Sequence, residues 1–168
     1  MAEFINTIDV LGDDAVIDSI IERTITEFKD NSIATVGNSA FHNCTALTEL
    51  DLPNATNLGD SAFSGCSALT AVDFPAVTSI GSSAFNRCSA LTALILRNET
   101  MCTLSNTNAF NNTPIASGTG YIYVPRALVD TYKAATNWST YAAQFRALEA
   151  YTVDGTTTGA LDPAKTGG

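Results

Sequence analysis

The strongest constraint on how this chain folds is an internal repeat in which the same residue types return every 22 positions. Three segments match column by column: VGNSAFHNCTALTELDL at 36–52, LGDSAFSGCSALTAVDF at 58–74 and IGSSAFNRCSALTALIL at 80–96. A fixed period of this length is typical of solenoids, in which each repeat is one structural unit that packs only against its neighbours. We therefore expect a single elongated domain built by stacking.

Each repeat ends in a short alternating stretch, which predicts one parallel strand per repeat. The strands are expected at 50–52, 72–74 and 94–96, with the outer residues buried and the middle residue facing out. Pro53 and Pro75 end the first two strands, because proline lacks the N–H donor that a ladder needs. The Gly-x-Ser-Ala-Phe-x-x-Cys stretch is expected to form a helical or 3₁₀ turn on the opposite side. The residues expected in buried columns are Phe41, Phe63, Phe85, Cys44, Cys66 and Cys88.

The repeat becomes irregular at both ends, and this predicts the domain organisation. The stretch 25–28 lies 22 residues before 47–50 and matches it in part, whereas the last Ala-Phe pair, at 109–110, follows the preceding pair by 25 residues. A short stack exposes apolar surface at both ends and therefore needs caps. The predicted parts are an N-terminal strand and helix cap at 1–24, about three regular repeats with irregular ends at 25–120, a C-terminal strand and helical cap at 121–150, and a flexible tail at 151–168.

Apolar periodicity predicts helices in both caps. Asp13 and Asp14 are suitable N-cap residues for a helix that ends near Arg23. At the other end, 121–124 is an expected strand, and Pro125 suits the first turn of a following helix. The Thr- and Gly-rich stretch after these helices has almost no large apolar residues and is expected to be a linker. The two C-terminal helices are expected to bury Leu128, Val129 and Tyr132 in the first, and Trp138, Tyr141, Phe145 and Leu148 in the second.

The spacing Leu-x-x-Leu-x-Leu-Pro, followed by an aliphatic residue and Gly-x-x-Ala-Phe-x-x-Cys-x-x-Leu, resembles the BspA-like leucine-rich repeat family over about 25–110. The resemblance implies an α/β solenoid, a short leucine-rich repeat with parallel strands of 22-residue period and helical N- and C-terminal caps. The chain departs from the family pattern at Arg97, where proline is expected, and in the cysteine column after Cys88. Family members are commonly surface adhesins or host-interaction proteins, and those without a secretion signal look like phage tail or virion proteins.

Charge and hydropathy exclude several partners. Eight Lys and Arg against seventeen Asp and Glu give a net charge of −9, which repels phosphate backbones and anionic lipid headgroups. The longest apolar runs, such as 121–124, are far below the ~20 residues that span a bilayer. The sequence starts MAEFIN and is expected to carry no secretion signal. We therefore expect no nucleic-acid partner and no direct membrane insertion.

Neither a catalytic centre nor a metal or cofactor site is expected. Stacking places the three repeat cysteines in a line without histidine, whereas zinc needs four converging ligands, so buried free thiols are the expectation. Cys102 lies outside this column and is also expected to be inert. His42 is the only histidine, and its column holds Ser64 and Asn86 elsewhere, so nothing orients it as a base. The acidic residues Asp9, Asp13, Asp14 and Asp18 miss the spacing of a calcium-binding loop.

The outward face of the strands remains as the candidate binding surface. Its two columns grade from charged residues near the N-terminus to apolar residues near the C-terminus, beside a ladder of threonines. Solenoids bind partners on such extended faces, although an ordinary solvated sheet face has the same pattern. The residues predicted to contact a partner are Glu27, Lys29, Thr48, Glu49, Asp51, Thr70, Asp73, Thr92 and Ile95.

Two functional classes remain open at this stage. The first is a non-catalytic binding or adhesion module on a virion, such as a phage tail or fibre, that recognises a protein or glycan on the bacterial surface. The second is a structural virion protein that uses the solenoid for contacts with other virion proteins or with copies of itself. The expected location is the virion, after synthesis in the host cytoplasm, with the bacterial cell surface as the alternative. Fold alone does not separate these classes.

Overall fold

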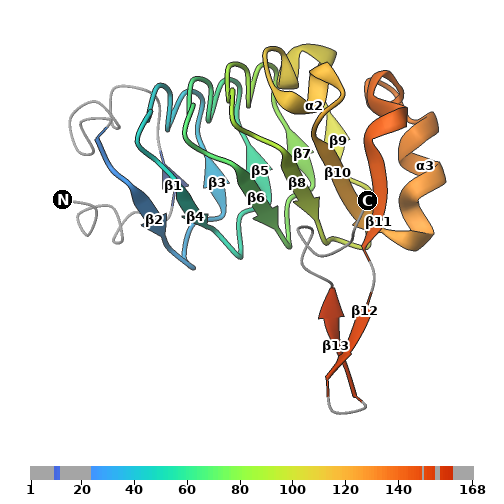
Figure 1. The fold of residues 1–168 in the computed structure, drawn as a ribbon. Coiled ribbons are helices and arrows are strands. Elements are labelled where there is room, and N and C mark those ends of the chain that lie inside the picture. Colours follow the sequence, from blue (N-terminus) through green and yellow to red (C-terminus); the bar gives the residue numbers. More distant parts are fainter. Residues whose placement is uncertain (1–9, 12–23, 149, 154–155, 161–168) are drawn as a thin grey trace.

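The computed structural model describes residues 10–11, 24–148, 150–153 and 156–160, with side chains over 24–148. Successive coils of the chain stack side by side, so that strands from consecutive repeats form two columns (Figure 1). Among the described residues, the helical elements gather at the C-terminal end of the stack (Figure 1). The helix predicted to end near Arg23 lies outside the described residues.

One column is a continuous five-stranded parallel sheet of two-residue strands, in the order β1-β3-β5-β7-β9. Its central strands keep the 22-residue register, as in the pairs Thr35 with Asn57 and Asn57 with Ser79. This second strand in each repeat was not predicted, because a strand of two residues has no alternation that a sequence pattern can reveal. The strands are Val10–Leu11 (β1), Thr35–Val36 (β3), Asn57–Leu58 (β5), Ser79–Ile80 (β7) and Thr103–Leu104 (β9).

The other column holds the predicted strands and consists of two separate parallel sheets. One pairs β2 with β4, and the other has the order β11-β10-β8-β6. The strands expected at 50–52, 72–74 and 94–96 are confirmed to within one residue as β4, β6 and β8. The bounds are Glu27–Lys29 (β2), Glu49–Asp51 (β4), Ala71–Phe74 (β6), Ala93–Leu96 (β8), Tyr121–Pro125 (β10) and Phe145–Leu148 (β11).

The Ala-Phe-x-x-Cys stretches, for which a helical or 3₁₀ turn is predicted, form successive turns with hydrogen bonds three residues back, as in a 3₁₀ turn, and not a continuous helix. In the middle repeat, alternate N–H groups donate to the next repeat, as Phe63 N does to Ala84 O at 2.8 Å. The intervening N–H groups donate three residues back, as Cys66 N does to Phe63 O at 3.1 Å. This alternation needs left-handed residues at Ser61 and Gly65, with φ of 56° and 81°. A helix is excluded, because it would direct every N–H back along its own repeat.

A stack of phenylalanine rings forms the centre of the core. Ring centroids lie 5.1 Å apart between Phe41 and Phe63 and 5.5 Å apart between Phe63 and Phe85, with interplanar angles of 9°. Phe28 covers one end of this stack at 5.2 Å from Phe41, and Phe110 extends it at the other. The predicted Phe and Cys columns are fully buried. The rings of this column therefore depend on the neighbouring repeats for much of their burial.

The C-terminal end closes over the stack through polar contacts and aromatic packing. Trp138 Nε1 donates to Cys102 O at 2.8 Å, and Cys102 N donates to the hydroxyl of Tyr132 at 2.7 Å. The second predicted helix is instead a 3₁₀ segment with a kink at Tyr141, and 145–148 is the strand β11, because it pairs in parallel with β10. The helical elements are Thr107–Phe110 (η2, 3₁₀), Pro114–Ser117 (α2), Arg126–Leu128 (η3, 3₁₀), Val129–Ala134 (α3) and Trp138–Gln144 (η4, 3₁₀).

The segment expected to be a flexible tail contains a β-hairpin. Ala150–Val153 (β12) pairs antiparallel with Thr156–Ala160 (β13), and Figure 1 shows the pair projecting from the body of the solenoid. Threonine and valine are β-branched and favour extended backbone, so the Thr-rich composition is compatible with strands. The composition was interpreted as a linker because the segment has little apolar side chain to bury.

Candidate partner-binding face

The structure brings the predicted contact residues to one side of the stack, which we call the strand face. It is the outward side of the strands β2, β4, β6 and β8 and the threonines that precede them. Among the predicted residues here, all are exposed except Asp73, which is half-buried, and Ile95, which is buried. The strand face consists of Glu27, Lys29, Thr48, Glu49, Asp51, Thr70, Ala71, Asp73, Thr92, Ala93 and Ile95.

The threonine ladder has a structural role in addition to its exposure. Thr48 Oγ1 lies 3.2 Å from Thr26 O, and Thr92 Oγ1 lies 3.2 Å from Thr70 O. Both hydroxyls donate to the backbone of the preceding repeat, and the corresponding N–H groups do the same. These side chains therefore join adjacent coils and have less hydrogen-bonding capacity left for a partner.

The C-terminal part of the strand face is closed, which differs from the prediction for Ile95. Ile95 is only 4% exposed and packs in a cluster with Ala93 and Tyr123. Tyr121 borders this cluster, and the Arg146 guanidinium lies 4.5 Å from the centre of the Tyr121 ring. The prediction treated β10 as part of a cap, whereas β10 pairs with β8 and extends the face with two tyrosines. The exposed part is therefore the polar, N-terminal part.

The strand face is interrupted between β4 and β6. Thr48 N donates to Thr26 O and Thr92 N donates to Thr70 O, both at 2.9 Å, but the hydrogen bonds of the described residues include none from Thr70 N to Thr48. At the other end of the strand, Arg97 N donates to Phe74 O at 3.3 Å. The residue equivalent to Arg97 one repeat earlier is Pro75, which has no N–H to donate. In the described part of the chain, the backbone hydrogen bonds that join the other neighbouring strands are thus missing at both ends of the pair β4 and β6.

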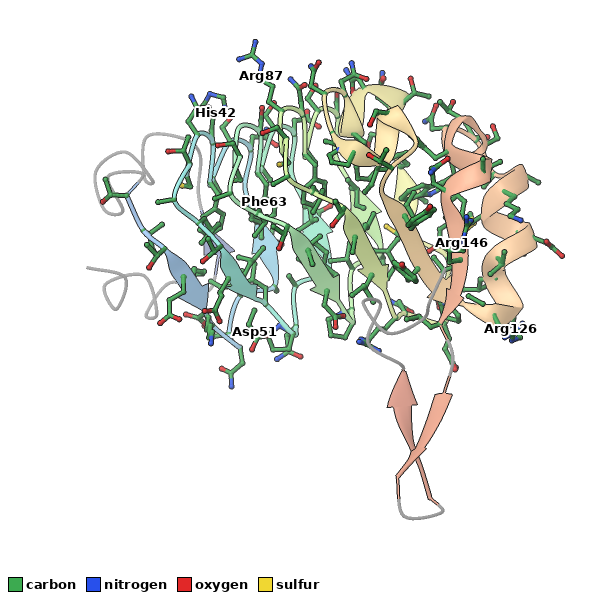
Figure 2. All side chains as sticks on the ribbon, viewed as in Figure 1. His42, Asp51, Phe63, Arg87, Arg126 and Arg146 are labelled. Atoms are coloured by element: carbon green, nitrogen blue, oxygen red, sulfur yellow. The ribbon has the colours of Figure 1, made fainter. Side chains whose placement is uncertain are left out.

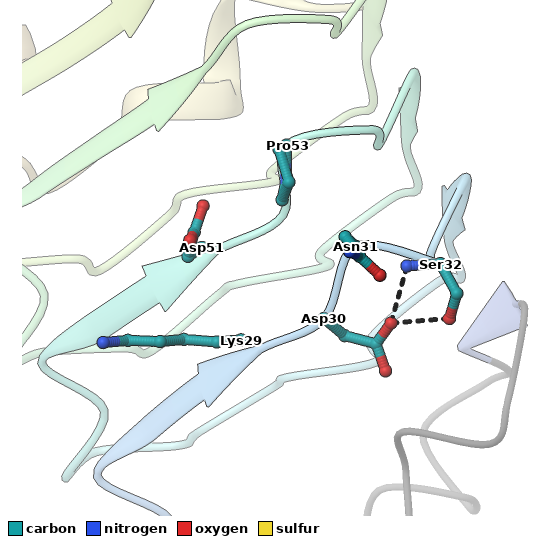
Figure 3. A pocket seen from close by; sticks show the side chains of 6 residues that line it. All are labelled: Lys29, Asp30, Asn31, Ser32, Asp51 and Pro53. Atoms are coloured by element: carbon teal, nitrogen blue, oxygen red, sulfur yellow. Dashed lines mark hydrogen bonds between the residues drawn. The ribbon is translucent and has the colours of Figure 1, made fainter.

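Two open hollows lie on the two sides of β4. One is about 400 Å³ in volume and lies between the ends of β2 and β4 (Figure 3). The other is about 320 Å³ and follows the gap between β4 and β6, where Leu50 is only partly buried. Lys29 and Asp51 line both hollows. The remaining lining residues are Asp30, Asn31, Ser32 and Pro53 in the first, and Thr48, Glu49, Leu50, Ala71, Val72 and Asp73 in the second.

The charged side chains around these hollows are not equally paired. Lys29 Nζ lies 3.4 Å from Glu49 Oε2 and 3.8 Å from Glu27 Oε2, in an exposed cluster. Asp73 accepts two parallel hydrogen bonds from Arg97, both at 2.8 Å. Asp51 has no ion pair or hydrogen bond to its carboxylate within the part of the chain that the structure describes. The exposed centre of the face therefore presents an unpaired negative charge.

Asp30 is a functional candidate that the sequence analysis missed. It is 8% exposed, and its Oδ1 accepts from Ser32 N at 2.7 Å and Ser32 Oγ at 2.5 Å. Its buried Oδ2 has no hydrogen-bond partner. The repeat alignment contained the signal, because Asp30 occupies the column that holds the buried residues Leu52 and Phe74 in later repeats. A carboxylate in an apolar column is costly unless something compensates it.

The other candidate groups do not form a chemical site. Burial raises the pKa of Cys88 and of Cys102 to about 12, which keeps both thiols protonated and unreactive. His42 lies at the turn edge of the stack, at the opposite edge from Asp51 (Figure 2). Within the described ranges, no cluster of three or more His, Cys, Asp or Glu could hold a metal ion. The same ranges contain no helix that is long and apolar enough to cross a membrane.

Parallel strands in stacked 22-residue coils, with a polar outward face, define a leucine-rich repeat solenoid, a class that generally mediates protein interactions. The chain belongs to the BspA-type leucine-rich repeat family: the family model "BspA type Leucine rich repeat region (6 copies)" matches residues 20–125, more than half of the sequence. No curated protein matches the sequence.

A solved leucine-rich repeat protein from Bacteroides ovatus has a similar fold, with a TM-score of 0.57 and 20% sequence identity. The alignment covers 74% of this chain and 30% of that chain, so this chain spans less than a third of the length of the solved protein. At this level of identity the likeness shows the fold alone.

Proposed function

We propose that this chain is a non-catalytic binding module whose polar, N-terminal part of the strand face contacts a protein partner. The observation that carries the proposal is the contrast along this face: the C-terminal part is closed around Ile95, whereas Asp51 is exposed and unpaired between two hollows. An exposed, unpaired carboxylate beside a concave surface is available for charge complementarity with a basic partner.

The charge of the chain supports the choice of partner. A net charge of −9 favours a basic protein surface over nucleic acid or anionic lipid. The hollows are shallow, so affinity depends on several modest contacts across the face. A glycan is the alternative ligand, because open polar grooves with carboxylates and threonines also suit sugar hydroxyls.

We propose a virion surface as the location, with recognition of a protein on the bacterial surface as the role. The support is the resemblance to BspA-like repeat proteins of phage tails, and the bacterial cell surface is the alternative location. Under this proposal the exposed polar face is directed toward the host, and the solenoid acts as a spacer that presents it.

Binding of the purified chain to intact candidate host cells tests the function. We expect saturable binding that weakens when Asp51 and Asp73 are both changed to asparagine, because the change removes charge without removing volume. The matched control is His42→Asn on the opposite edge, which introduces the residue type found at the equivalent Asn86. Absence of binding, together with stoichiometric incorporation into particles, would instead support a structural assembly protein.

A further inference from the structure

The repeat contains its own example of how a carboxylate on the strand face is recognised. Asp73 on β6 accepts from Arg97 Nε and Nη2, one hydrogen bond to each carboxylate oxygen at 2.8 Å. This bidentate arrangement matches the planar fork of a guanidinium to a carboxylate. Arg97 comes from the following repeat, 24 residues further along the chain.

One repeat earlier, the carboxylate is present and its guanidinium is missing. Asp51 is equivalent to Asp73, and the two occupy the same outward position on β4 and β6. The residue equivalent to Arg97 is Pro75, which carries no charge and no donor. The nearest cation lining the hollows, Lys29, is already engaged with Glu27 and Glu49. Asp51 therefore has the position of the carboxylate in such a bidentate pair, but the described part of the chain supplies no guanidinium for it.

The surroundings of Asp51 leave space for a side chain of a partner. On one side of Asp51, a hollow of about 400 Å³ lies between the ends of β2 and β4, and the Asp30 carboxylate at its wall points away from Asp51 toward Ser32 (Figure 3). The open gap between β4 and β6 lies on the other side of Asp51. Both hollows thus flank the unpaired carboxylate.

We propose that the face around Asp51 binds an arginine side chain of the partner protein, with the guanidinium paired to Asp51 as Arg97 is paired to Asp73. The inference rests on the proposed function and specifies the chemistry that the face recognises. Arginine has five N–H donors in a fixed plane, so it pairs with Asp51 and keeps donors for the adjacent hollow. Calcium is less suited, because it takes six to eight oxygen ligands and the carboxylates that line this hollow are those of Asp30 and Asp51.

The substitution Pro75→Arg tests the geometry within the chain. We expect the introduced guanidinium to pair with Asp51 in a crystal structure of the variant, as Arg97 does with Asp73, since the backbone at the equivalent position already accepts arginine. The matched control is Pro75→Gln, which removes the ring without adding charge. An introduced side chain that extends into solvent, with Asp51 unpaired, would overturn the proposed geometry.

Selection from a random seven-residue peptide library tests the recognition. With the full chain as bait, we expect enriched peptides to contain arginine, and we expect about a tenfold loss of affinity for Asp51→Asn and for Pro75→Arg but not for Pro75→Gln. Replacement of the peptide arginine by lysine should weaken binding, because the bidentate geometry is lost.

The outcomes separate this inference from the proposed function. Enriched peptides without arginine, or arginine peptides that bind Asp51→Asn equally well, would overturn the arginine site while leaving a binding module. Binding that depends on calcium and not on arginine would also overturn it. A chain that enriches no peptide and binds no cell would overturn both proposals.

Discussion

Phe85 and Phe110 stack with ring centroids 5.7 Å apart and planes within 2° of parallel, although 25 residues separate them instead of 22. The irregular repeat therefore keeps its place in the aromatic column and absorbs the additional residues elsewhere. Phe110 also contacts Trp138 at 6.0 Å and Tyr141 at 5.4 Å. The Phe110 ring therefore joins the aromatic column of the repeats to the aromatic residues of the C-terminal segment.

The middle ring of the column should be the most sensitive core position. Phe63 contacts Phe41 on one side and Phe85 on the other, so Phe63→Ala leaves a cavity between two repeats. We expect the free energy of unfolding to fall by about 3–5 kcal/mol. Thermal or urea denaturation followed by circular dichroism measures this change, with the exposed Glu99→Gln as a control. An unchanged melting temperature for Phe63→Ala would contradict the stacked core.

The cysteines should resist modification in the native protein. Cys44, Cys66, Cys88 and Cys102 are all fully buried, and Cys88 Sγ donates to Phe63 O at 3.1 Å. We expect reagents such as iodoacetamide to label them at the rate of unfolding in native buffer and rapidly in denaturant. Mass spectrometry after timed quenching gives the rate for each site. Rapid native labelling of the three repeat cysteines would be incompatible with the buried column.

Alkaline pH should destabilise the fold through the buried thiols. Cys88 has its pKa raised from its usual 9.0 to about 12 in the folded chain, mainly by burial. The unfolded state therefore releases a proton above about pH 9 that the folded state retains up to about 12, so the free energy of unfolding falls as pH rises through this range. Below about pH 9 the thiol is protonated in both the folded and the unfolded state, so its contribution to the free energy of unfolding is fully present. Urea titrations at a series of pH values should give a shallower slope for Cys88→Ala, and an equal slope would contradict the shift.

The hydroxyl of Tyr132 should stabilise the C-terminal closure. It accepts from Cys102 N at 2.7 Å in a buried position, so Tyr132→Phe leaves that N–H without this partner. We expect a loss of about 1–3 kcal/mol in chemical denaturation. Tyr121→Phe is the matched control, because no hydrogen bond of its hydroxyl is present among the described contacts. Equal stability of the two variants would show that this hydrogen bond contributes little.

The stacking itself was predictable from the sequence for a simple physical reason. In a solenoid, residues one period apart become neighbours, so the 22-residue register directly places Phe41 beside Phe63 and Cys66 beside Cys88. The strands β4, β6 and β8 follow from local alternation and from the prolines after the first two. The outward columns, including Asp51 and Asp73, follow from the same alternation.

Other features were decided by contacts that no repeat pattern contains. Phe145–Leu148 has the pattern of an apolar helix face by itself and becomes a strand only because β10 offers a parallel edge. Ile95 is buried because β10 brings Tyr123 onto the same face. The ion pair between Asp73 and Arg97 required side-chain geometry across two repeats, although each residue was visible in the alignment.

The sequence by itself therefore determined the repeat, its register, the buried columns and the side of the stack that faces outward. The tertiary structure decided which part of that side is open. It closed the face around Ile95, interrupted the ladder next to Pro75, and left Asp51 without the guanidinium that its equivalent Asp73 has. The physical reason is that periodicity records what the repeats share, whereas the contacts of an individual side chain, such as Asp51 or Asp73, depend on which residue the next repeat places beside it.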